Sequence, residues 1–222
     1  IRQAGHEFDK MRKRINRHLN QRTEMLSGIS HDLRTPLTRM KLQLAFVKDE
    51  NLTKKLTEDI NEMEKMLNEY LQFTRSSHAE KDEMFNLSEL IENIIIKYDD
   101  KNITQDLTQR VYINGRKNLI NRSLNNIIDN ALKYAKKVDI KLDKKNTNLF
   151  IIIDDDGPGI PKSEHENVFK PFYKIDKSRA ESKSSVGLGL SIASDIIRSH
   201  GGNIKLESSK MNGLRVKIFL PV

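Results

Sequence analysis

A long apolar seam in the first third of the chain most constrains what it can fold into. The seam residues recur at steps of three, four and occasionally seven: Phe8, Met11, Ile15, Leu19, Leu26, Ile29, Leu33, Leu37, Met40, Leu44 and Val47. This spacing places them on one stripe of a long helix that packs on other helices. A polar break at 49–51 precedes a second seam, made of Leu52, Leu56, Ile60, Met63, Leu67, Leu71 and Thr74.

Two helices joined by a short loop form an antiparallel hairpin. One hairpin covers its own apolar stripe poorly, whereas two hairpins paired into a four-helix bundle cover it well. The seams therefore predict a homodimer.

Composition limits the classes of protein that fit. The chain has 222 residues, 36% hydrophobic and 32% charged, a net charge of +8 and no cysteine. Disulfides and cysteine-ligated zinc are excluded. Nucleic-acid binding is one interpretation of the positive charge. Phosphorylated ligands or an acidic partner explain it as well, because the basic residues are mixed with acids.

Membrane and targeting signals are missing from the sequence itself. No apolar stretch approaches the roughly 20 residues that cross a bilayer, and no signal-peptide pattern opens the chain. Because the sequence starts at Ile1 without an initiator methionine, we expect it to be part of a longer protein.

Beyond a polar stretch at 76–83, which we interpret as a linker, the pattern changes to mixed helix and strand. We expect a helix capped by Ser88 and carrying Leu90 to Ile95. Further helices are expected at 116–135 and 191–200, and strands at 138–142, 149–153, 204–206 and 214–220, the last two joined by an Asn212-Gly213 turn. Helices on one face of a mixed sheet form an α/β sandwich.

Ser30–Leu37 is the first segment that suggests chemistry. His31 lies two residues from the seam on either side, so it points away from the bundle core. A neutral imidazole is a competent nucleophile near pH 7. Asp32 is placed to accept a hydrogen bond from the second ring nitrogen, and Thr35 lies one turn on. By itself the segment is more often a surface pair, and we give that surface interpretation to His6, His18, His78, His165 and His200.

A second segment places Asn126, Asn130, Lys133 and Tyr134 on one helix face. The opposite face carries Leu124, Ile128 and Leu132. Amide oxygens suit Mg²⁺, and a lysine suits phosphate. The alternative is an ordinary polar face toward solvent.

The third segment, Asp154–Ile160, follows an apolar strand. Its glycines allow a ligand close to the backbone, and a carboxylate at a strand end can accept a hydrogen bond from an exocyclic amine. The alternatives are a tight acidic turn or a Ca²⁺ loop, although the ligand spacing of an EF-hand is missing.

The fourth segment, Ser184–Leu190, places glycines before a helix N-terminus, where backbone N–H groups can meet a phosphate. It is neither a P-loop nor a dinucleotide fingerprint. Earlier in the chain comes Phe169–Lys174. It is followed by a polar run at 176–185 that is typical of a mobile lid over a nucleotide.

Together and in this order, these segments resemble the histidine kinase family over nearly the whole chain. Ser30–Leu37 resembles its H box, Asn126–Tyr134 its N box, Asp155–Gly159 its first glycine box, Phe169–Phe172 its F box and Gly187–Leu190 its second glycine box. The string that begins at Ser30 is most similar to the EnvZ-like osmosensor type. The first 15 residues resemble the last helix of a HAMP signalling module.

The resemblance implies an α domain, a two-helix hairpin forming a dimeric four-helix bundle, plus an α/β sandwich of the Bergerat (GHKL) ATPase type. The implied organisation is a signalling helix at 1–17, a phosphoacceptor hairpin at 18–77, a linker at 78–85 and an ATP-binding domain at 86–222.

The resemblance also implies residue roles. His31 becomes the phosphoacceptor, Asp32 its acid–base partner and Thr35 the residue that positions water for a phosphatase reaction. Asn130, with Asn126, is implied to hold Mg²⁺. The implied nucleotide contacts are Asn126, Asn130, Lys133 (phosphate), Tyr134, Asp155 (adenine amino group), Gly157, Gly159, Ile160, Phe172, Lys174, Gly187, Leu188, Gly189 and Leu190.

We therefore expect autophosphorylation of His31 from ATP and Mg²⁺, then transfer to an aspartate of a response regulator. The expected setting is the cytoplasmic portion of a bacterial inner-membrane protein that makes no direct nucleic-acid contact. Ser185 replaces the usual first glycine of the second glycine box, which puts the rate of lid closure in question. The alternatives are an ATP-driven dimer clamp, which needs no His31, and a non-enzymatic scaffold, which intact Asn130 and Asp155 oppose.

Overall fold

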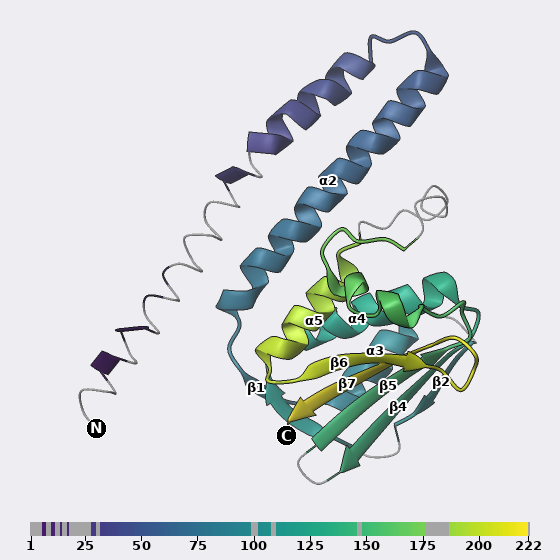
Figure 1. Cartoon of the computed structure of the whole chain (residues 1–222). Coiled ribbons are helices and arrows are strands. Elements are labelled where there is room, and N and C mark those ends of the chain that lie inside the picture. The colour runs from purple at the N-terminus through teal and green to yellow at the C-terminus, as the bar shows by residue number, and fades with distance from the viewer. Residues whose placement is uncertain are drawn as a thin grey trace. The chain divides into compact units, whose positions relative to one another are not determined.

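The computed structural model describes residues 6–7, 10–11, 14, 17, 28–29, 32–98, 102–107, 110–145, 148–175 and 187–221. The chain divides into two compact units, Ile1–Ala79 and Glu80–Val222 (Figure 1). Within the described residues, no helix is both long and apolar enough to span a membrane.

The first unit is a helical hairpin, as the seams predict. Residues 32–44 are helical, residues 45–49 form the turn, and helix α2 runs over Glu50–Ala79 (Figure 1). The turn lies earlier than the expected break at 49–51 because Asp49 caps α2: its Oδ1 accepts from the Leu52 N–H at 3.0 Å and its carbonyl from the Thr53 N–H at 2.9 Å. Lys41 Nζ lies 2.7 Å from Glu64 Oε2, joining the two helices.

The hairpin buries only part of its seam. Leu37 and Ile60 are 6% and 5% exposed. Other seam residues stay between 37% and 47% exposed, namely Ile29, Leu33, Met40, Val47, Leu52, Leu56 and Met63. A single hairpin therefore leaves much of its apolar stripe accessible.

The connection between the units is shorter than the linker expected at 78–85. Helix α2 continues to Ala79 and strand β1 starts at Glu83, so only residues 80–82 lie between them. The stretch at 76–79 lacks a periodic apolar pattern but contains neither glycine nor proline. A helix that is already formed can extend through such polar residues at little cost.

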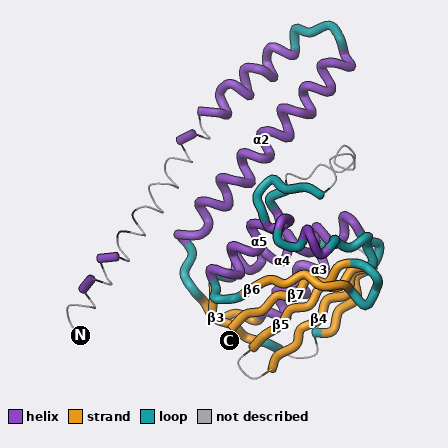
Figure 2. The backbone as a smooth tube through the Cα atoms, in the orientation of Figure 1, coloured by secondary structure: helices purple, strands orange, loops and turns teal. Residues whose placement is uncertain are grey.

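The second unit is an α/β sandwich. Its main sheet has the order β2-β4-β5-β7-β6, with β2 parallel to β4 and every other pair antiparallel (Figure 1). In Figure 2 these strands form one orange layer beside the purple helices. The bounds are β2 Ile103–Asp106, β4 Val138–Lys145, β5 Asn148–Asp155, β6 Asn203–Ser208 and β7 Leu214–Pro221. A small antiparallel pair is formed by β1 (Glu83–Asn86) and β3 (Tyr112–Gly115). Strands β4 to β7 match the expected ones, whereas β1, β2 and β3 were not predicted.

Helices α3 (Leu87–Ile96), α4 (Lys117–Tyr134) and α5 (Gly189–Ser199) lie on one face of the main sheet (Figure 1). Two short 3₁₀ helices, Lys162–Glu164 and Asn167–Phe169, follow β5. Alternate residues of the central strands meet the helices in the core. Fully buried side chains there include Ile120, Leu124, Ile128, Ile140, Leu149, Ile151, Ile153 and Ile197. The expected fold class is confirmed.

The cap of α3 is Asn86 rather than Ser88. The Asn86 side chain accepts from the Ser88 N–H at 3.1 Å and the Glu89 N–H at 3.4 Å. Ser88 is buried, and its hydroxyl accepts from the Val111 N–H at 3.2 Å. The expectation of a Ser88 cap was wrong because the pairing of β1 with β3 brings Val111 to that hydroxyl.

We expect Asn86→Ala to lower the free energy of unfolding of this unit by about 1 kcal/mol, the usual effect of removing a side-chain cap. Urea unfolding followed by tyrosine fluorescence measures it. Asn114→Ala, an exposed asparagine on β3, is the matched control and should change stability little. Equal losses in the two variants would contradict the role of Asn86.

Candidate functional site

Helix α4 turns a polar face away from the core, as its sequence predicts. Asn126, Asn130 and Lys133 are half-buried and Tyr134 is 46% exposed. On the other side, Leu124 and Ile128 are fully buried and Leu132 is half-buried. The Lys133 ammonium lies 5.6 Å from the centre of the Tyr134 ring.

Asn126 carries a buried polar atom with an unmet hydrogen-bonding requirement. Its Nδ2 has no hydrogen-bond partner within the described part of the chain. Gly189, the first residue of α5, lies against it: a Cβ on Gly189 would be 3.8 Å from Asn126 Cβ. Since buried polar groups are normally satisfied, a ligand group is expected here. Rotation of the amide offers that ligand either a donor or an oxygen.

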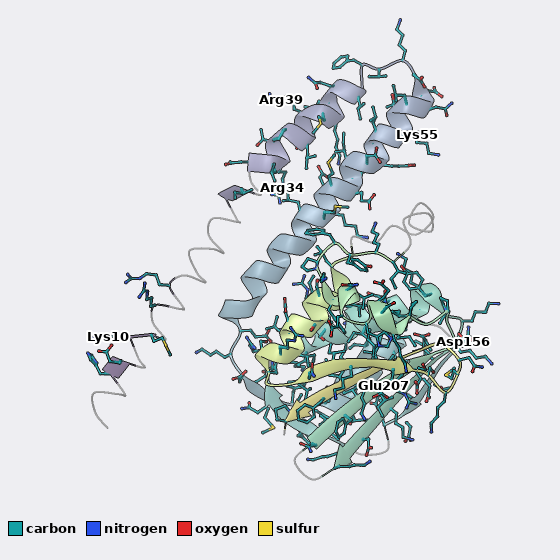
Figure 3. The ribbon with its side chains drawn as sticks, viewed as in Figure 1. Lys10, Arg34, Arg39, Lys55, Asp156 and Glu207 are labelled. Atoms are coloured by element: carbon teal, nitrogen blue, oxygen red, sulfur yellow. The ribbon has the colours of Figure 1, made fainter. Side chains whose placement is uncertain are left out.

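Three consecutive carboxylates lie at the end of β5, and the outer two bind neighbouring segments. Asp154 forms a bidentate pair with Arg215 on β7, at 2.8 Å to Nε and 2.7 Å to Nη2. Asp156, at the edge of the α/β unit (Figure 3), accepts from the N–H groups of Lys136 and Lys137 at 2.7 and 2.8 Å. These two bonds hold the pKa of Asp156 below its usual value. The residues that follow α4 are thereby fixed to the end of β5.

The middle carboxylate, Asp155, points inward and is 5% exposed. Its Oδ1 accepts from the Gly157 N–H at 2.9 Å and the Leu214 N–H at 3.0 Å. Burial raises the pKa of Asp155, and the two N–H donors oppose that shift. Within the described residues no hydrogen bond reaches Oδ2. One oxygen is therefore fixed by the protein, and the other remains for a ligand.

Two glycines let the backbone close around Asp155. A Cβ on Gly213 would lie 2.3 Å from the Asp155 carbonyl oxygen and 2.4 Å from Oδ1, so only glycine fits there. A Cβ on Gly157 would lie 3.0 Å from the Tyr134 carbonyl oxygen, so the loop passes close to the end of α4. Sequence reasoning assigned Gly213 only to a hairpin turn. The Asn-Gly signal for that turn gave no indication of contact with Asp155.

The end of Phe169–Phe172, which resembles the F box, contacts the start of Gly187–Leu190, which resembles the second glycine box. The Phe172 N–H donates to the Gly187 carbonyl at 3.0 Å. Gly187 has a φ of +77°, and a Cβ there would lie 3.0 Å from the Tyr173 carbonyl oxygen. Leu188 is buried, and Lys174, Gly189 and Leu190 are half-buried. The segment 176–186, with Ser185, lies outside the described residues.

The loop that follows Asp155 is also ordered by local contacts. Gly159 has a φ of +68° and lies near the Gly213 carbonyl, at 3.5 Å from a Cβ placed on it. The neighbouring Ile160 is half-buried, and its carbonyl lies 3.0 Å from His165 Nε2. His165 was interpreted as a surface residue, but this contact makes it part of the loop.

His200 also departs from the surface interpretation. It is half-buried, its Nδ1 donates to the Ile196 carbonyl at 2.8 Å, and its Nε2 accepts from the Arg116 N–H at 3.1 Å. These bonds require the neutral ring, and burial lowers the pKa of His200. The sequence offers no signal for this role, because Arg116 is far away along the chain.

Ser30–Leu37, the segment that resembles the H box, belongs to the helical unit. Asp32 and Thr35 are helical and exposed. His31 and Ser30 lie outside the described residues, so the expected direction of the imidazole stays a prediction. The structure groups the predicted residues of the second unit into one area and leaves Asp32 and Thr35 in the other unit.

A divalent cation at this site would bind amide oxygens together with oxygens of phosphate and water. Within the described residues, no group of three or more His, Cys, Asp or Glu side chains is arranged to hold a metal ion. Mg²⁺ commonly binds through one or two protein oxygens together with phosphates and water. The amides of Asn126 and Asn130 suit that mode of binding.

Two protein families and several sensor histidine kinases match this chain. Residues 21–79 match the family described as His Kinase A (phospho-acceptor) domain, and residues 115–222 match the Histidine kinase-, DNA gyrase B-, and HSP90-like ATPase family. Among curated relatives, 99% of the chain aligns with the sensor histidine kinase GtrS of Pseudomonas aeruginosa at 33% identity, covering 46% of GtrS. It aligns with the sensor histidine kinase CpxA of Escherichia coli K12 at 32% identity, covering 99% of this chain and 51% of CpxA.

A solved structure shares the fold. The Acinetobacter baumannii histidine kinase AdeS superposes with a TM-score of 0.58 at 23% identity, over 86% of this chain and 97% of that one. The chain spans about half the length of the curated relatives it matches. With a match to the phospho-acceptor family followed by a match to the ATPase family, and with these relatives aligned over 99% of its length, the chain belongs to the sensor histidine kinase family.

Proposed function

We propose that this chain is a protein-histidine kinase core that phosphorylates its own His31 from ATP and passes the phosphoryl group to an aspartate of a response regulator. The observation that carries the proposal is the Asp155 carboxylate, with one oxygen held by two backbone N–H groups and the other left for a ligand. Such a group recognises an exocyclic amine, which adenine has and guanine lacks at the corresponding position.

The nucleotide follows from that anchor. The adenine amino group donates to Asp155 Oδ2, and Tyr134 borders the base. The phosphates extend along α4 past Lys133, toward the Asn126 side chain and the start of α5. Mg²⁺, when bound to Asn130 and Asn126 together with phosphate oxygens, would neutralise charge on the phosphates.

His31 is the acceptor of the γ-phosphoryl group. One neutral ring nitrogen forms the N–P bond as the bond from the γ-phosphorus to the β–γ bridging oxygen breaks, and ADP leaves. Asp32 accepts a hydrogen bond from the other ring nitrogen and stabilises the positive charge that develops on the ring. In the next step the phosphoryl group moves from His31 to a carboxylate oxygen of the regulator's aspartate.

Thr35 follows His31 by four residues in the sequence and is exposed. We assign it to the reverse activity, in which its hydroxyl positions a water molecule to hydrolyse the phosphoaspartate of the regulator.

The active form is a homodimer. The seam residues that one hairpin leaves 37% to 47% exposed are the surface that a second hairpin would cover. Sedimentation equilibrium tests this, and a monomer at micromolar concentration would contradict it.

The proposed organisation of the chain is a signalling helix at 1–17, a phosphoacceptor hairpin from 18 to the end of α2, a short connection at 80–82 and an ATP-binding domain that begins with β1. The division of the chain into compact units after Ala79 supports the separation of the last two domains. The parent protein is anchored in the bacterial inner membrane, with this portion in the cytoplasm. A fusion of the full-length protein that stays in the soluble fraction after lysis would contradict the anchor.

Incubation with radiolabelled ATP and Mg²⁺ should label the wild-type chain with acid-labile, alkali-stable phosphate. His31→Gln should abolish the label because the only acceptor nitrogen is lost, and Asn130→Ala should reduce it at least tenfold because a cation ligand is lost. His18→Gln is the matched histidine control. Equal labelling of His31→Gln and the wild type would overturn the proposed function in favour of an ATP-driven clamp.

Asp155→Asn should weaken ATP binding by about 10- to 100-fold, the effect of a buried polar mismatch. The amide oxygen must keep accepting from Gly157 and Leu214, so the NH₂ group is forced toward the adenine amino group, donor against donor. The same NH₂ can donate to the 6-oxygen of guanine. Titration calorimetry should therefore show a reduced preference for ATP over GTP.

Asp156→Asn is the control for that experiment, since it makes the same chemical change at the next residue and keeps the oxygen that binds Lys136 and Lys137. Its ATP affinity should stay close to that of the wild type. An unchanged ATP affinity in Asp155→Asn would remove the adenine contact from the proposal.

Thr35→Ala should slow the loss of phosphate from a receiver domain that the wild-type chain has phosphorylated, roughly tenfold or more, which is the lower range for loss of a group that assists proton transfer or water positioning. Thr38→Ala, in the same helix, is the control, because its hydroxyl is already bonded to the Arg34 carbonyl at 3.0 Å. Equal dephosphorylation rates in all three proteins would assign water positioning to another residue.

A further inference from the structure

The connection between α2 and β1 is bound to the α/β unit by its acidic side chains. Glu80 Oε1 accepts from the Asn118 N–H at 2.7 Å, and Asp82 Oδ1 lies 4.0 Å from Arg116 Nε. Both contacts reach the same place, the N-terminus of α4. The connection is therefore attached to the helix that carries the proposed nucleotide-binding face.

The N-terminus of α4 needs such a partner. Arg116 stands at the cap position, and its side chain makes no capping hydrogen bond. The first N–H groups of a helix have no partner within the helix, and a carboxylate is the favoured group near them. Glu80 supplies from another segment the cap that the helix lacks in its own sequence.

Arg116, which lies at the start of α4, is itself bound to the end of α5. The Arg116 guanidinium donates to the Ser199 carbonyl at 3.0 Å and to its hydroxyl at 2.6 Å, and the Arg116 N–H donates to His200. A Cβ on Gly115 would lie 3.0 Å from His200 Cδ2, so the chain approaches the ring closely. These bonds hold the start of α4 against the end of α5. The Asp82 side chain is 63% exposed, so its ion pair with Arg116 adds little stability. Glu80 is the main contact.

We propose that Glu80 is a positioning residue that latches the connection onto α4 and so limits how the ATP-binding unit moves relative to the hairpin. The proposal rests on the proposed function. While the latch is closed, no free residue separates Ala79 from the α/β unit. When it opens, residues 80–82 add about 10 Å of extended chain.

Movement is needed because His31 has two partners in turn. The ATP-binding unit must bring ATP to His31 and then leave room for the receiver domain, so it takes at least two placements in every cycle. A closed latch leaves only the backbone torsions at the Ala79–Glu80 junction to change the placement of the unit. In this proposal a large change of placement opens the bond between Glu80 and Asn118, so a weaker latch speeds turnover.

Trypsin cleavage after Lys81 reports the latch directly, because this exposed lysine lies between Glu80 and Asp82. Glu80→Ala should raise the cleavage rate at Lys81 roughly tenfold, the factor typical of losing a hydrogen bond to a charged group. Glu80→Gln keeps an acceptor oxygen and should fall between Glu80→Ala and the wild type. Glu83→Gln, which removes the same charge from an exposed residue at the start of β1, should cleave like the wild type.

The same variants are then assayed for autophosphorylation across a range of ATP concentrations. We expect kcat to rise severalfold in Glu80→Ala with an unchanged KM for ATP, and Glu80→Gln to rise less. A raised KM would show that Glu80 only supports the fold of α4, and would overturn the latch. Faster cleavage with an unchanged or lower kcat would overturn it as well.

Failure of the proposed function is distinguishable from failure of the latch. A wild-type chain that takes up no phosphate on His31 contradicts the proposed function. A phosphorylated wild type whose cleavage and kcat match those of Glu80→Ala contradicts only the latch.

Discussion

The site depends on one buried carboxylate held by two backbone N–H groups. Asp155 sits where β5 ends beside β7, and its Oδ1 is bonded to Gly157 on its own loop and to Leu214 at the start of β7. An unpaired carboxylate at 5% exposure would be costly. The two donors offset part of that cost, and they require the glycine at 213, where a Cβ would overlap the Asp155 oxygens.

The position of α4 relative to that carboxylate is fixed at both ends of the helix by acidic side chains from elsewhere. At its C-terminal end, Asp156 bonds the N–H groups of Lys136 and Lys137. At its N-terminal end, Glu80 bonds the N–H of Asn118. The sequence of α4 supplies neither contact. The end of β5 therefore holds the end of α4 that carries Asn130 and Lys133, whereas the segment that connects the two units contacts only its N-terminus.

How far the sequence predicts this structure depends on how local each signal is. The described part of the seams, the alternation of β4 to β7 and the polar face of α4 are periodic patterns, and each matches the structure. Phe8, Ile15, Leu19 and Leu26 of the first seam lie outside the described residues. Strands β1 to β3 have four residues each, too few for a period to stand out. The contact of Gly213 with Asp155 and the bond between Arg116 and His200 join segments that only the folded chain brings together, so residue order does not reveal them. The cap of α3 is local, but Asn86 and Ser88 are both suitable cap residues, and it is the bond from Val111 to Ser88 that leaves the cap to Asn86.

The partly buried seam connects stability to function in the helical unit. Seven large apolar side chains there remain between 37% and 47% exposed. Burial of apolar surface stabilises a fold by roughly 25 cal/mol per Å², and the exposed part of these side chains does not yet contribute that free energy. A partner that covers this surface stabilises the folded hairpin by mass action. The same association that completes the core supports the helix over residues 32–44, which directly follows His31 in the sequence. In the proposed function the phosphoacceptor hairpin is therefore completed by assembly, whereas the unit Glu80–Val222 has a core of its own.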